Sequence, residues 1–272
     1  MSVQAPPAAT ALRFPPSRLA GAGLLAALAA FAILGPWLIT ADPAEQDFSA
    51  SLAPIGGEYL LGADHYGRSL LARLAHGARL SFGMAVLTTL TAALPGILLG
   101  LLAAWHGGLV ERLLEFLANI VLALPGLLLV LLLLAFAPGD FGPLYVGLAL
   151  TLWVEFYRVT RATTAALLKQ PHIEAAKLLG FPPGYILRSY VLPVIAANTV
   201  TLAAFAMAAA IIAVSTLSAI SVGLQPPTPE LGSMIVELLP YYSEAPVHLL
   251  LPALLIFLLV LALQLVAQRQ DG

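Results

Sequence analysis

The stretch Leu80-Ser-Phe-Gly-Met-Ala-Val-Leu-Thr-Thr-Leu-Thr-Ala-Ala-Leu-Pro-Gly-Ile-Leu-Leu-Gly-Leu-Leu-Ala-Ala104 contains no charged residue. A helix needs roughly 20 predominantly apolar residues to cross about 30 Å of hydrocarbon, so this stretch is long enough for one span. Lipid cannot hydrogen-bond the backbone, whereas a helix satisfies its own N–H and C=O groups. The stretch therefore predicts a transmembrane helix and an all-α fold.

Further apolar stretches predict additional spans and bring the total to about six transmembrane helices. They cover residues 19–39, 116–137, 141–157, 192–217 and 246–267. The stretch 141–157 is the weakest because it contains Glu155 near its end. Of the 272 residues, 60% are hydrophobic and 10% charged, where about a quarter charged is typical of soluble domains. So few charges cannot cover a globule of this size, and the sequence predicts a polytopic membrane protein.

Composition also excludes several classes of function. The net charge of −2 leaves no basic surface for nucleic acid. Cysteine is absent, which excludes disulfides, thiolate metal sites and cysteine nucleophiles. Motifs of serine hydrolases, zinc proteases and phosphate-binding loops are missing, so the chain is not expected to be an enzyme or to hold a cofactor. No metal site is expected either, because the histidines are scattered: His65, His76, His106, His172 and His248.

The basic residues predict the orientation, because cytoplasmic loops are enriched in lysine and arginine. Of 12 basic residues, three (Arg68, Arg73 and Arg79) fall in the segment 40–79, and the other nine fall on the opposite side. We therefore expect a cytoplasmic N-terminus at 1–18, a periplasmic segment at 40–79 and a cytoplasmic tail at 268–272. A signal peptide is an alternative for 19–39, but its apolar core is usually only about 7 to 15 residues. The length favours a retained first helix.

The longest cytoplasmic loop, 158–191, carries its own helix signals. Pro171 suits a first helical turn, where its missing N–H costs nothing, and Glu174 lies favourably in that turn. Gly180 is a typical stop, and residues 182–184 (Pro-Pro-Gly) force a turn. The pattern predicts a short helix, a turn and a second helix that enters the next span.

Polar residues near the ends of two spans allow more than one interpretation. Glu155 is a functional candidate as an intramembrane acid, but i,i+3 spacing favours an ion pair with Arg158. Glu115 and Asn119 share one helical face. They would line a polar path, or Asn119 would bond a neighbouring helix.

The cytoplasmic loop and the start of the next span contain Glu174-Ala175-Ala176, Gly180 and, at the downstream spacing, Leu192-Pro193. This pattern resembles the EAA loop of permeases from binding-protein-dependent ABC importers, except that Tyr190 replaces a usual isoleucine. In that family the loop forms a coupling helix that sits in a groove of the cytoplasmic ATPase. The resemblance implies ATPase coupling by Glu174, Ala175, Ala176, Lys177, Gly180, Leu192 and Pro193.

Two outer segments narrow the resemblance to dipeptide, oligopeptide and nickel permeases of the DppC, OppC and NikC type. Residues 61–69, Leu-Gly-Ala-Asp-His-Tyr-Gly-Arg-Ser, are similar to the family's LGTDxxGRD, and residues 223–232 are similar to GVQPPTPxWG. Ala63 and Ser69 depart from the usual threonine and aspartate. The periplasmic motif residues are Gly62, Asp64, His65, Gly67, Arg68, Gln225, Pro226, Pro227 and Gly232.

The resemblance implies an importer permease in a bacterial inner membrane, with residues 80–267 as its transmembrane domain. The implied partners are a second related permease, two cytoplasmic ATPases that bind ATP and Mg, and a periplasmic or lipid-anchored binding protein. Peptides are the first expected cargo, and nickel or a metal chelated by an opine-type metallophore is the alternative. A secondary transporter would need an inverted repeat and ion-coupling polar residues mid-membrane, and a membrane scaffold would not explain the loop motif.

Overall fold

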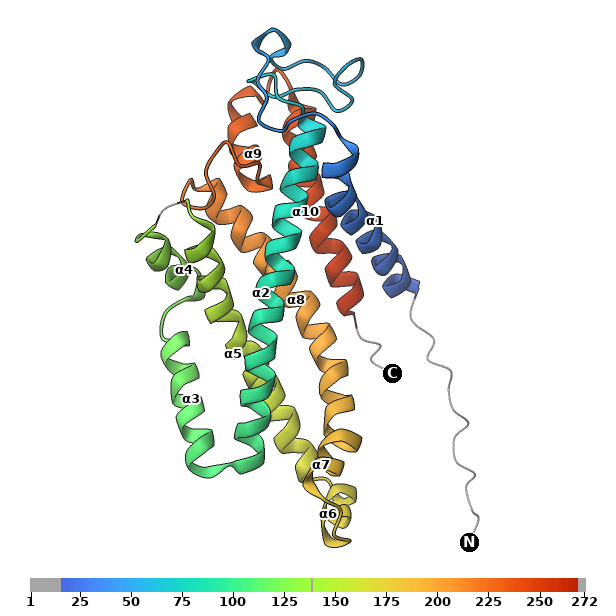
Figure 1. Ribbon diagram of the computed structural model, residues 1–272, viewed down its shortest axis with the longest axis vertical. Helices are drawn as coiled ribbons and strands as arrows, with labels where there is room; N and C mark the ends of the chain where they lie inside the picture. The colour runs from blue at the N-terminus through green and yellow to red at the C-terminus, as the bar shows by residue number, and fades with distance from the viewer. Residues whose placement is uncertain (1–15, 138, 269–272) are drawn as a thin grey trace.

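The computed structural model describes residues 16–137 and 139–268, which form helices and turns (Figure 1). The helices are α1 (Pro16–Leu38), α2 (Leu70–His106), α3 (Gly108–Leu122), α4 (Gly126–Leu134), α5 (Phe141–Leu168), α6 (Pro171–Leu178), α7 (Pro183–Ile186), α8 (Leu192–Ala219), α9 (Leu231–Leu238) and α10 (Pro246–Ala267). Short 3₁₀ turns cover Phe48–Ala50 and Leu239–Tyr241, and a π-helical turn covers Leu187–Val191. The chain is all-α, as expected.

Four helices in the described residues are long and apolar enough to cross a membrane. They are α1, α2, α10 and the continuous helical stretch Pro183–Ala219, which includes α8. A fifth candidate exists if α3 and α4 count as one span that is bent by 69°. The sequence predicted six spans, and α5, which corresponds to the stretch 141–157, is not among these candidates.

Two predicted spans differ from the observed helices for local reasons. The stretch 116–137 is broken, because Pro125 lies between α3 and α4 and cannot donate a backbone hydrogen bond. The helix predicted at 80–104 begins earlier, at Leu70, where the Ser69 hydroxyl accepts a hydrogen bond from the Ala72 N–H. This first turn includes Arg73, a charge that sequence alone assigns to the loop.

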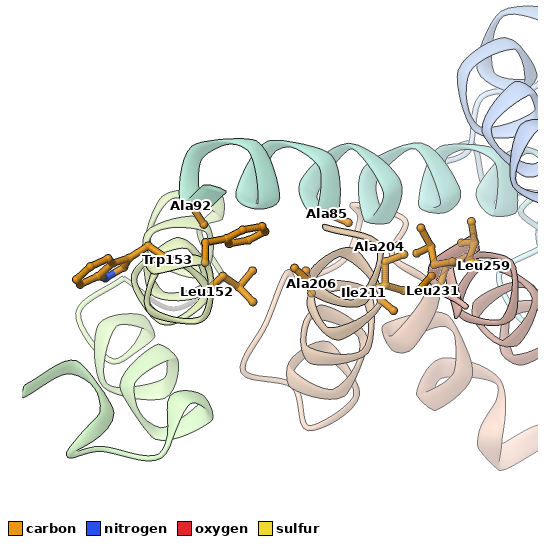
Figure 2. Packing of buried hydrophobic residues seen from close by; sticks show 14 of the residues in the cluster. Ala85, Ala92, Leu152, Trp153, Ala204, Ala206, Ile211, Leu231 and Leu259 are labelled. Carbon is orange, nitrogen blue, oxygen red and sulfur yellow. The ribbon is translucent and has the colours of Figure 1, made fainter. Parts of the chain in front are cut away.

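The core forms where α2 packs against its neighbours. Ala85 and Ala92 of α2 face side chains of α5, α8 and α10, so the helix axes can approach closely (Figure 2). The closest approach is to α5, because a Cβ added at Gly96 would lie 2.6 Å from both the Phe156 Cβ and the Trp153 carbonyl oxygen. Helix α1 packs on the outside, where its Gly21 meets Leu265 of α10.

The helices place the two kinds of sequence motif at opposite ends of the molecule (Figure 1). The segment between α1 and α2 lies at one end, together with α9. Helices α6 and α7 form a tip at the other end. The chain therefore offers two separate surfaces, one for each set of motif residues.

Candidate functional site

Helix α6, at the tip of the molecule, begins and ends as its sequence predicts. Gln170 is the N-cap residue and Pro171 occupies the first turn. Ile173 is fully buried and Ala176 is nearly so, which fixes one side of the helix on the protein. The Lys177 ammonium donates a hydrogen bond to the Leu168 carbonyl at 3.3 Å, and so ties α6 back to the end of α5.

Gly180 ends α6 in a Schellman motif. The Phe181 N–H donates to the Ala176 carbonyl at 3.1 Å, and the Gly180 N–H donates to the Lys177 carbonyl at 3.0 Å. The φ of Gly180 is +81°, a left-handed conformation that L side chains rarely adopt. No atom lies within 4 Å of a Cβ added there, so glycine is needed for its backbone conformation and not for space.

The opposite side of α6 is exposed and partly apolar. Glu174, Ala175 and Lys177 face outward. Leu178 and Leu179 are 89% and 77% exposed at the end of the helix. Two adjacent exposed leucines flanked by polar groups form an apolar patch of the kind found at interaction sites.

The start of α8 is a π-helical turn that supports this tip. The Leu192 N–H donates to the Leu187 carbonyl, five residues back, and Pro193 follows in the first turn of α8. Leu192 and Pro193 are both exposed. The Tyr190 ring lies 5.6 Å from the ring of His172, so the residue that replaces the usual isoleucine packs against α6.

At the other end, Asp64 organises the first outer motif. Its Oδ1 accepts from the backbone N–H groups of Tyr66 (2.8 Å) and Arg68 (3.0 Å). Its Oδ2 pairs with the Arg68 Nε at 2.6 Å, and both side chains are almost fully buried. The motif thus folds into a closed turn around one carboxylate.

Arg73 and Glu237 complete a buried group of four charges, here named the outer charge cluster: Asp64, Arg68, Arg73 and Glu237. The Arg73 Nη2 lies 3.0 Å from the Glu237 Oε2, and the Arg73 Nε lies 3.5 Å from the Asp64 Oδ2. Arg68 also pairs with Glu237. Two carboxylates and two guanidiniums balance each other, so the cluster joins the outer segment, α2 and α9 without net charge.

The remaining residues of the first motif make close contacts. A Cβ on Gly67, whose φ is +73°, would lie 1.7 Å from the Asp47 carbonyl oxygen, and one on Gly62 would lie 2.3 Å from the His248 Nε2. His65 is half-buried, and its ring stacks on Tyr241 at 5.1 Å. Burial lowers the pKa of His65 below its ordinary value.

The second outer motif folds around Glu230 at the start of α9. Its carboxylate accepts from the backbone N–H groups of Gly232 (2.7 Å) and Ser233 (2.9 Å) and from the Ser215 hydroxyl (3.0 Å). Burial raises its pKa, and these hydrogen bonds oppose that shift. Gly232 is required because a Cβ there would lie 2.1 Å from the Ser215 carbonyl oxygen.

Three other predicted residues of the second motif, Gln225, Pro226 and Pro227, are exposed. Gln225 donates to the Ser221 carbonyl at 2.7 Å, and its side chain lies on Gly139. Pro226 and Pro227 follow in an exposed turn. Sequence reasoning did not select Arg73, Glu230 or Glu237, although Glu230 lies within the second motif and the other two follow the motifs by a few residues.

The predicted pair of Glu155 with Arg158 is wrong. Arg158 donates instead to the Asn119 Oδ1 on α3 at 2.9 Å, while Glu155 is exposed. Asn119 therefore bonds a neighbouring helix, one of the two alternatives that its position allowed. A partner on another helix outcompetes the local i,i+3 neighbour because α3 packs beside α5.

No group of three or more His, Cys, Asp or Glu side chains among residues 16–137 and 139–268 could hold a metal ion. The two surfaces are built from ion pairs, caps and exposed apolar side chains. They suit binding to other proteins rather than bond-breaking chemistry.

Comparison with known proteins identifies the family of the chain. Residues 96–271 match the family model described as the inner membrane component of binding-protein-dependent transport systems. The chain is 34% identical to the di/tripeptide transport system permease protein DppC of Pseudomonas aeruginosa, over 86% of this chain and 79% of the relative. It is 30% identical to the dipeptide transport system permease protein DppC of Haemophilus influenzae, over 88% and 83%. The chain therefore belongs to the family of inner-membrane permease components of binding-protein-dependent ABC transporters, and it is a transport subunit rather than an enzyme.

Proposed function

We propose that this chain forms half of a translocation pathway for di- and oligopeptides and pairs with a second, related permease. The named relatives are di/tripeptide and dipeptide permeases, which supports peptides as the cargo. The family implies an ATPase and a binding protein as partners. We place two ATPases at the α6 tip and the binding protein at the opposite end.

The observation that carries the proposal is the exposed side of α6. Leu178 and Leu179 are almost fully exposed, next to the outward-facing Glu174 and Ala175. An apolar surface of this kind in a cytoplasmic loop needs a protein to cover it. We assign this role to the ATPase and the coupling function to Glu174, Ala175, Ala176, Lys177, Gly180, Leu192 and Pro193.

The proposal also fixes the topology. The α6 tip faces the cytoplasm, and the segment 40–69 and α9 face the periplasm, with both chain termini cytoplasmic. The basic residues support this orientation, because most of them lie on the α6 side. Arg68 and Arg73, two of the outer three, are neutralised within the outer charge cluster.

The test is to co-express the chain with its genomic neighbours, purify the complex and measure ATP hydrolysis. Binding protein loaded with a dipeptide is expected to stimulate hydrolysis and uptake into vesicles. Stimulation by binding protein loaded with chelated nickel instead would replace peptide with metal as the cargo. A chain that purifies without an ATPase would contradict the permease role.

A substitution at the tip tests the assigned surface. Ala175→Trp places bulk on the exposed side of α6 and is expected to abolish uptake while the chain still inserts into the membrane. Ala135→Trp is the matched control, because Ala135 is exposed at the end of α4, away from α6. Equal uptake by the two variants would contradict the docking of ATPase on α6.

A further inference from the structure

Helix α3 has the reverse of the usual amphipathic arrangement, since its polar side faces the protein. Glu111, Glu115 and Asn119, each one turn after the last, face α5. The opposite side is apolar and exposed, with Leu113 at 59% and Phe116 at 65%. Ala118 is the sole buried residue of α3. The apolar packing of α3 on the core rests on Ala118 and on the partly buried Leu114 and Val121.

Polar contacts link α3 to α5 beside this apolar packing. Arg161 pairs with Glu111, and its Nη2 lies 2.9 Å from the Glu115 Oε2. Arg158 donates to the Asn119 Oδ1 at 2.9 Å. These five residues are here named the α3–α5 strap. Its ion pairs are about two-thirds buried, so solvent screens them less than exposed pairs.

The same helix, α5, continues directly to α6. Only Lys169 and Gln170 separate the two helices. The Gln170 N–H donates to the Leu167 carbonyl at 2.9 Å, and the Lys177 ammonium donates to the Leu168 carbonyl. A displacement of α6 therefore moves the end of α5 that carries the strap.

Space exists for α3 to move. A cavity of about 490 Å³ lies above the strap, between Leu117 and Val121 of α3, Pro95 of α2, and Trp153 of α5. The link between α3 and α4 at residues 123–125 is the 69° bend. The cavity leaves the apolar contacts between α3 and α5 incomplete. The strap therefore connects the movement of α3 to that of α5.

We infer that the α3–α5 strap is a transmission element, in which Arg161 makes α3 move with α6 during the transport cycle. Arg161 acts here as a positioning residue, through Glu111 and Glu115. The inference rests on the proposed function, because it requires a partner that displaces α6. Movement of α3 then changes the bend to α4 and the shape of the cavity.

The first test measures distances in the assembled complex. The chain contains no cysteine, so cysteines introduced for spin labels are unique within it. Labels at Leu113 and Lys169 report on α3 against the end of α5, and labels at Lys169 and Leu254 report on α5 against α10. All three positions are exposed. When the complex is trapped with a non-hydrolysable ATP analogue, the second distance is expected to change and the first to stay constant. A first distance that changes as much as the second would overturn the inference.

The second test compares transport per ATP hydrolysed. Arg161→Ala is expected to lower this ratio by roughly fivefold or more, the low end of typical coupling between sites. The inverted set Glu111→Arg, Glu115→Arg and Arg161→Glu rebuilds the pairs and is expected to restore it. Arg112→Ala is the control, because Arg112 is exposed on α3 and makes no ion pair within the described residues.

These outcomes separate the strap from the proposed function. If Arg161→Ala transports as much substrate per ATP hydrolysed as the unaltered chain, and the ATPase still co-purifies, the strap inference fails and the permease role stands. If no ATPase co-purifies with the unaltered chain, the proposed function fails first. The distance test uses the native strap residues, so it remains decisive even if Arg161→Ala does not fold.

Discussion

Arg73 and Glu237 are 164 positions apart in the chain, yet the Arg73 Nη2 lies 3.0 Å from the Glu237 Oε2. The contact joins the first turn of α2 to α9, and Asp64 and Arg68 complete the group. It places the second outer motif beside the first. This end of the permease is thus one unit built from both halves of the chain.

Glu237→Gln is expected to destabilise this unit strongly. The substitution leaves two buried guanidiniums facing one carboxylate, and breaking a buried pair costs about 3–5 kcal/mol. Thermal unfolding of the purified complex measures the loss. Glu244→Gln is the control, since Glu244 is exposed on the same side of the molecule. Equal unfolding midpoints for both variants would show that the cluster contributes no stability.

Gly96→Ala is expected to destabilise the packing of α2 against α5. Its Cβ would lie 2.6 Å from the Phe156 Cβ, and overpacking of this kind costs about 1–3 kcal/mol. Gly83→Ala lies on the same helix with no atom within 4 Å of the added Cβ, so helix propensity predicts a gain of about 0.5–1 kcal/mol. Unfolding measurements on both variants check the opposite signs.

His65 predicts a pH dependence of stability. Burial lowers its pKa below the ordinary 6.5, so the unfolded chain binds more protons than the folded one in that range. The stability contributed by neutral His65 is complete above 6.5 and is lost as the pH falls below it. His65→Phe keeps an aromatic ring against Tyr241 but removes the titrating group. Between about pH 7.5 and about pH 5, its unfolding midpoint is therefore expected to change less with pH than that of the unaltered chain. An unchanged slope would contradict the assignment.

Two variants of Gly180 test whether the turn after α6 matters through its backbone. Asparagine tolerates a left-handed conformation, whereas a β-branched residue there is a genuine outlier. Because the space around Gly180 is open, Gly180→Asn is expected to retain most uptake and Gly180→Val to lose most of it. Uptake assays in vesicles distinguish the two, and equal uptake would mean that the turn does not depend on φ.

Most local signals in the sequence predicted the observed helices. Residues 246–267 match α10, and the predicted span at 192–217 matches α8 within two residues. Pro171 and Gly180 bound α6 as expected, because caps and stops act over only a few residues. The prediction that residues 116–137 form one helix failed at Pro125, although that proline was visible.

The failures of sequence reasoning concern pairs of distant residues. Arg158 and Asn119 are on different helices, and no helical periodicity connects them. The i,i+3 spacing therefore led to the prediction that Arg158 pairs with Glu155, the nearest acid in the same helix. The outer charge cluster was missed for the same reason. Arg73 and Glu237 are 164 positions apart, and no local pattern in the sequence indicates that they pair.

The exposed leucines at the end of α6 have a consequence for the life of the subunit before assembly. In the proposed topology, each newly inserted copy exposes Leu178 and Leu179 to the cytoplasm until a partner covers them. Chaperones and proteases recognise exposed apolar patches of this kind. We therefore expect the cell to keep permease and ATPase in matching amounts by clearing orphan copies rather than by tuning synthesis alone.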